Sequence, residues 1–114
     1  MYNIVYTEDV NQVVAAVIID ARAIIMPSGI DGNQVQVYID QAVAKINDNT
    51  LVYKIEVDSG TLVGYFTLQV NRQTKVCVRD SIVVRPAYQS LIVGIISVTD
   101  QFITSNDWHN DILF

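Results

Sequence analysis

The chain has 114 residues, a length typical of one domain, and 51% of them are hydrophobic while 17% are charged. This is the profile of a packed globular chain, which excludes a disordered one. Its formal net charge is −5, and its few Lys and Arg residues are scattered. That argues against wrapping nucleic-acid phosphates, which requires a basic face.

The sequence gives no sign of export or of membrane insertion. Glu8 and Asp9 lie where a signal peptide would be apolar, and no apolar run approaches the ~20 residues of a membrane span. Cys77, the only cysteine, cannot close a disulfide within the chain, and its apolar neighbours place it inside a strand. We expect a soluble protein, not secreted by a signal peptide, that is intracellular or associated with a virion.

The first half of the chain predicts one short strand and two helices. Residues 2–6 alternate loosely, as in a strand. Asp9, with Gln12 three residues later, fits a capping box before an amphipathic helix that Pro27 ends. After a loop, Asp31 or Asn33 caps a second amphipathic helix that reaches about residue 47.

The second half changes to strand periodicity. Residues 51–57, 61–70 and 75–84 form three strands joined by tight turns, and Gly64 marks a bulge or a close backbone approach. The break at 85–89, Arg-Pro-Ala-Tyr-Gln, is followed by an apolar helix that starts near Ser90. The expected fold is α+β, in the order β-α-α-β-β-β-α, with a mainly antiparallel four-stranded sheet. One domain spans residues 1–107, and residues 108–114 form an apolar tail.

Two stretches resemble the GNAT acetyltransferases (GCN5-related N-acetyltransferases). Residues 62–68, Leu-Val-Gly-Tyr-Phe-Thr-Leu, are similar to a strand of that family. Residues 81–89, Ser-Ile-Val-Val-Arg-Pro-Ala-Tyr-Gln, are similar to the segment before its acetyl-CoA motif. The resemblance implies the N-terminal part of a GNAT domain, degenerate and truncated at its C-terminus.

In that family a Gln/Arg-x-x-Gly-x-Gly/Ala loop holds the cofactor diphosphate on backbone N–H groups, and glycine allows the close approach. Gln89 matches the first position and Gly94 the last, but Ile92 replaces the central glycine. No Lys or Arg lies between Gln89 and Asp107. We therefore expect Ile92 to obstruct the diphosphate, and we expect no cofactor and no metal.

The sequence also lacks a matching set of catalytic residues. The resemblance implies a tyrosine acid after this helix, yet the last tyrosine is Tyr88. Glu56 and Asp58 lie where some members place a carboxylate, but Asp-Ser-Gly at 58–60 is also an ordinary turn. His109, the only histidine, is expected at the surface. We expect no catalytic residues.

Two functions of different class remain open. The first is a non-catalytic structural or interaction subunit of a larger assembly, for which a phage or virus particle component (collar, tail or capsid accessory) is one example. The second is an acetyl-CoA-dependent N-acetyltransferase completed by oligomerisation, in which Gln89, Ser90 and Gly94 bind the cofactor and Glu56 is the base.

The first function rests on apolar surface that a neighbour would cover. The strand at 75–84 has an open edge without a further strand, and isolated proteins avoid such edges. We expect a homo-oligomer or another protein partner, with no nucleic acid and no membrane. The expected interface consists of Val76, Val78, Ile82, Trp108, Ile112, Leu113 and Phe114.

Overall fold

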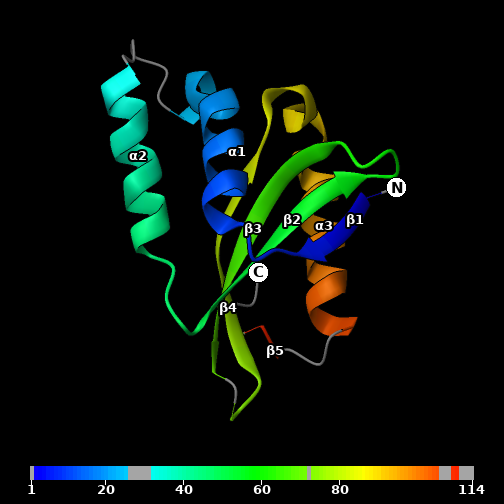
Figure 1. Cartoon of the computed structure of the whole chain (residues 1–114). Helices are drawn as coiled ribbons and strands as arrows, with labels where there is room; N and C mark the ends of the chain where they lie inside the picture. The colour runs from blue at the N-terminus through cyan, green and yellow to red at the C-terminus, as the bar shows by residue number, and fades with distance from the viewer. Residues whose placement is uncertain (1, 26–31, 72, 106–108, 111–114) are drawn as a thin grey trace.

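The computed structural model describes residues 2–25, 32–71, 73–105 and 109–110, with side-chain surroundings for 2–21, 34–71 and 73–105. Its elements follow the predicted order (Figure 1). They are β1 (Tyr2–Tyr6), α1 (Val10–Ile25), α2 (Gly32–Ala44), β2 (Thr50–Val57), β3 (Leu62–Asn71), β4 (Val76–Val84), the 3-10 helix η1 (Pro86–Leu91), α3 (Ile92–Ser105) and β5 (His109–Asn110). No helix in these ranges is long and apolar enough to cross a membrane.

The strands form one sheet in the order β1-β2-β3-β4-β5. The pairs from β1 to β4 are antiparallel, which confirms the predicted meander and its α+β class. The two-residue strand β5 is an addition to the expected four, and it pairs with β4 in parallel at Val76 and Cys77. The start of the β4 edge is therefore covered by this chain, whereas the edge was expected to be open throughout.

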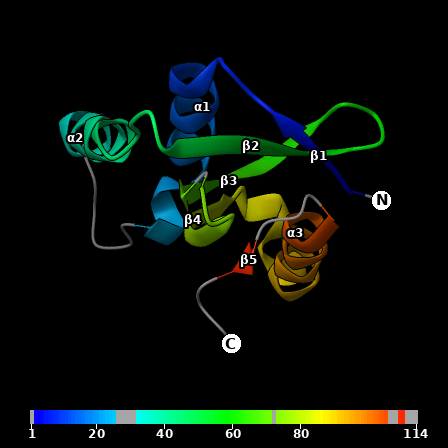
Figure 2. The ribbon, with the colours of Figure 1, turned by 90° about the horizontal axis from the view of Figure 1, so that it is seen from below.

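Helices cover both faces of the sheet (Figure 2). One face packs against α1 and α2 through a cluster that includes Val14, Val17, Val52 and Tyr65. The other packs against α3 through a second cluster that includes Phe66. Alternation along each strand produces these two cores, because successive side chains point to opposite faces.

Local differences from the prediction have simple causes. The Thr7 hydroxyl, rather than a capping box at Asp9, accepts a hydrogen bond at the start of α1, from the Asp9 N–H at 3.2 Å. The 3-10 helix η1 precedes α3, so the α-helix begins two residues later than expected. The register of β2 and β3 shifts beside Gly64, which confirms the bulge predicted there.

Candidate functional site

The turn that leaves β4 is held to the end of that strand. The Gln89 side chain donates a hydrogen bond from Nε2 to the Val84 carbonyl oxygen at 2.8 Å. The Arg85 guanidinium pairs with Asp20 of α1 at 2.8 Å and donates to the Leu62 carbonyl at 3.0 Å. These contacts fix the turn against β3 and α1. The predicted ligand residue Gln89 thus has a structural partner.

The side chains of the loop that starts α3 do not lie as expected. Ile92 is partly buried and packs against the core on the α3 face of the sheet. Its side chain therefore does not stand out from the loop, where we expected it to obstruct a cofactor diphosphate. The exposed apolar groups are its neighbours Leu91 (51% exposed) and Val93 (80% exposed). Gly94 borders open space, since an added Cβ atom would meet nothing within 4 Å. Ser90 is exposed.

Beyond β5, the edge of β4 has no strand partner among the described residues. Of the predicted interface residues, Val76 pairs with β5, Val78 is half-buried, and Ile82 packs against the α3-side core. Trp108, Ile112, Leu113 and Phe114 lie outside the described residues, as does most of the proposed tail. The side chain of His109 is likewise not described.

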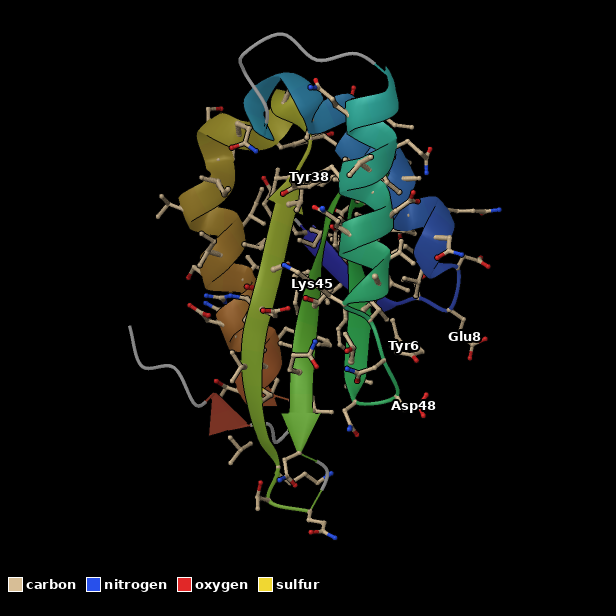
Figure 3. The ribbon with its side chains drawn as sticks, turned by 90° about the vertical axis from the view of Figure 1, so that its left-hand side faces the viewer. Tyr6, Glu8, Tyr38, Lys45 and Asp48 are labelled. Carbon is tan, nitrogen blue, oxygen red and sulfur yellow. The ribbon has the colours of Figure 1, made fainter. Side chains whose placement is uncertain are left out.

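A partly enclosed cavity of about 120 Å³ lies between α2 and the sheet, beside β3 and β4. It is larger than the roughly 10–15 Å³ that one water needs. Figure 3 shows this face, with Tyr38 and Lys45 extending from the α2 side toward β4. The lining residues are Tyr38, Gln41, Ala42, Lys45, Ile46, Thr50, Tyr65, Thr67, Gln69, Asp80, Ser81 and Val83.

One residue that lines the cavity, Thr67, has a hydroxyl group that lacks a partner and has almost no exposed surface. Thr67 is 5% exposed, and its hydroxyl forms no hydrogen bond with the described residues. An unpaired buried hydroxyl costs about 1–3 kcal/mol. Tyr65, on the same face of β3, is almost fully buried, and its burial, with a smaller effect from Tyr38, raises the pKa of the phenol to about 12. It remains protonated, and able to donate, at neutral pH.

The cavity also has one charged residue of each sign at its rim, and both are exposed to solvent. Lys45 follows the last residue of α2, and Asp80 lies on β4 where the register with β3 shifts. Within the described ranges, neither has an ion-pair partner. No group of three potential metal ligands occurs in those ranges.

The carboxylates considered from the sequence lie elsewhere. Glu56 pairs with Lys54 at 3.6 Å on β2 and does not line the cavity. Asp58 accepts a hydrogen bond from Asn3 at 3.3 Å, beside the turn that joins β2 and β3. Asp58 therefore occupies the ordinary turn that the sequence also indicated.

Sequence reasoning missed the residues that line the cavity, although one signal was present. The side chains at 65, 67 and 69 are polar or amphipathic at every second position of β3, so they share one face. The expected fold has helices packed on the sheet, with no space left between them. Nothing in the sequence indicated that α2 would leave space above it.

Comparison with known proteins bears on the fold. No protein-family model matches the chain, and no curated protein is similar in sequence. A putative acetyl transferase from Pyrococcus furiosus has a TM-score of 0.63 at 10% identity, covering 100% of this chain and 82% of that one. The PaiA N-acetyltransferase from Thermoplasma acidophilum, in complex with coenzyme A, has a TM-score of 0.61 at 11% identity. The match covers 93% of this chain and 74% of that one.

The chain has the GNAT acetyltransferase fold. A further likeness, to the ribosomal-protein-S18-alanine N-acetyltransferase from Escherichia coli, has a TM-score of 0.55 at 18% identity and covers 89% of this chain and 57% of that one. Identities this low support the GNAT fold alone. The structures named are acetyltransferases, and none is a particle component, so the comparisons give the virion role no support.

Proposed function

We propose that this GNAT-fold chain is an acyl-CoA-dependent N-acyltransferase domain whose acceptor amine enters the cavity under α2. The observation that carries the proposal is the unpartnered hydroxyl of Thr67, buried in a polar cavity beside β4. A scaffold gains nothing from an unsatisfied buried group, whereas binding sites commonly retain one for a ligand. The acetyltransferase fold supports the same choice.

Two places near β4 could hold coenzyme A: the open edge of the strand for the pantetheine arm, and the start of α3 for the diphosphate. The uncovered part of the β4 edge offers backbone N–H and C=O groups to an extended chain of amides such as the pantetheine arm. At the start of α3, Gly94 leaves open space and Ile92 is turned into the core. The diphosphate would lie beside Ser90 and Gly94, although the Ile92 N–H between them already donates to the Gln89 carbonyl oxygen.

Acyl-CoA supplies its acyl group as a thioester: the amine nitrogen forms the new C–N bond, the C–S bond breaks, and the thiol leaves with one amine proton. Asp80 binds the acceptor as its ammonium form and first accepts one proton from it, which passes to solvent, so that the neutral amine nitrogen can attack. Thr67 and Tyr65 orient the acceptor from the cavity floor, and the protonated phenol of Tyr65 donates a hydrogen bond. Ser81 and Val83 place this cavity directly against β4.

Two measurements test the proposal. Millimolar acetyl-CoA should raise the thermal midpoint by mass action, and acetyl-CoA with a panel of primary amines should give N-acetyl products and free thiol. Asp80→Asn should lower turnover. Asp40→Asn is the matched control, because Asp40 is exposed on α2, bonded to Gln36 and outside the cavity. Absence of both a midpoint shift and product would overturn the proposal.

The interaction module is the second candidate, and two observations favour it: the exposed Leu91 and Val93, and the part of the β4 edge that has no strand partner among the described residues. Light scattering on the purified chain tests it directly. A self-associating chain should become smaller when Leu91→Ser and Val93→Ser are introduced together. A monomer that binds acetyl-CoA would exclude self-association as the role of this surface and leave the acyltransferase.

A further inference from the structure

We propose that the cavity under α2 selects a small zwitterionic acceptor, a free amino acid or a compact amino acid-like compound. The proposal rests on the proposed function in one respect, that the bound amine is the group acylated. The ligand class itself is argued from the cavity residues.

The charge balance of the cavity carries the argument. Lys45 and Asp80 both line it, the other lining residues are neutral at pH 7, and neither charge has an ion-pair partner within the described ranges. A simple amine would pair with Asp80 and leave the exposed Lys45 ammonium to solvent alone. A simple acid would pair with Lys45 and leave the Asp80 carboxylate to solvent alone. A ligand that carries one charge of each sign satisfies both, and such complementarity gives specificity by rejecting the alternatives.

The neutral polar groups place the two ends of such a ligand. Lys45 extends from the α2 side toward β4 (Figure 3) and can hold the carboxylate. The Thr67 hydroxyl, which lacks a partner, donates to the same carboxylate. Asp80 then receives the ammonium group on β4, the strand whose open edge is proposed to hold the acyl donor. A charge-assisted hydrogen bond at each end fixes the orientation.

The walls of the cavity limit the size of the ligand's side chain. The cavity holds about 120 Å³, and its polar floor and Tyr38 wall leave room for a compact side chain. A peptide or a long polyamine would extend beyond this partly enclosed space. We therefore expect free amino acids with small or polar side chains to bind best.

Titration calorimetry and acyl-transfer assays on the full chain, without and with acetyl-CoA, test the class. The probes are serine as the zwitterion, N-acetylserine as the anion, serinamide as the cation and glycerol as the neutral polyol. Serine should bind at least about tenfold more tightly than the other three. Lys45→Met, Asp80→Asn and Thr67→Val should each weaken serine binding about tenfold or more. Asp40→Asn again serves as the control with an unchanged affinity.

The outcomes separate the two proposals. Acetylation of serine that is lost with Lys45→Met supports both. Acetylation of serinamide and serine at equal rates, insensitive to Lys45→Met, overturns the ligand class and sustains the acyltransferase. Serine binding that depends on Lys45 and Asp80, with neither product nor a midpoint shift with acetyl-CoA, sustains the ligand class and overturns the acyltransferase. Thermal midpoints of all variants show whether each is folded, and no binding by folded wild type to any small amino acid overturns the inference.

Discussion

Gly64 lies so close to Val83 that a Cβ atom on Gly64 would stand 2.2 Å from the Val83 carbonyl oxygen. This close approach joins β3 to β4 near the end of β4, next to the turn that leads into η1. Because the neighbour is backbone and cannot rotate away, Gly64→Ala should lower the free energy of unfolding by about 3 kcal/mol or more. Urea denaturation measures this loss.

Gly94→Ala is the control for that substitution. Gly94 lies in α3 with no neighbouring atom in reach of a Cβ, so the added methyl should stabilise the helix by about 0.5–1 kcal/mol. Equal effects of the two alanines would contradict the close approach of β3 and β4.

Thr67→Val removes the hydroxyl that has no partner while retaining the shape of the side chain. Without ligand, this substitution should raise the free energy of unfolding by about 1 kcal/mol, since an unsatisfied buried group disappears. Affinity for the acceptor should fall at the same time. Calorimetric unfolding of the ligand-free protein measures the first effect.

Thr99→Val is the comparison for Thr67→Val, because the hydroxyl of Thr99, on α3, has hydrogen-bond partners. The fully buried Thr99 hydroxyl accepts from Arg79 at 2.9 Å and donates to the Ile96 carbonyl at 2.8 Å. Its removal should destabilise by about 1–3 kcal/mol. A loss of stability in both threonine variants would show that Thr67 has a partner after all.

The fold could be predicted because the signals are local and agree with one another. The apolar stripe of α1, the stop before Pro27 and the alternation in β2 to β4 each specify an element. Gly64 was informative because glycine in a strand interior has few uses other than a bulge or a close approach. The order of elements followed from these assignments.

The candidate site could not be predicted in the same way. Whether Ile92 points at the loop or into the core depends on the angle at which η1 leads into α3, and this angle is set by contacts distant in sequence. The cavity depends on how far α2 stands from β4, which involves Lys45 and Asp80, residues 35 positions apart in the numbering. Periodicity reports which face is buried but not whether it is filled.

Arg79 joins β4 to α3 through a side chain that is 8% exposed, bonded to Thr99 and ion-paired with Asp100. Arg79→Ala should cost about 1–3 kcal/mol, because the buried Thr99 hydroxyl loses its donor and the buried stem of Arg79 loses its packing. Asp100 is half-exposed, so Asp100→Asn should cost about 1 kcal/mol or less. Guanidinium unfolding of both variants tests the ranking, and a larger loss for Asp100→Asn would contradict it.

Tyr65 should make the stability of the protein fall at alkaline pH. Burial raises the pKa of its phenol from 10.0 to about 12, so above pH 10 the unfolded chain loses this proton while the folded chain retains it. The stabilisation that comes from this pKa difference is complete below about pH 10 and is lost as the pH rises to about 12. The free energy of unfolding should fall by roughly 2–3 kcal/mol over this range. Urea unfolding across this range measures the decline. Tyr65→Phe lacks the titrating group, so its stability should fall less steeply than that of the wild type, and parallel curves would show that Tyr65 ionises equally well in the folded protein.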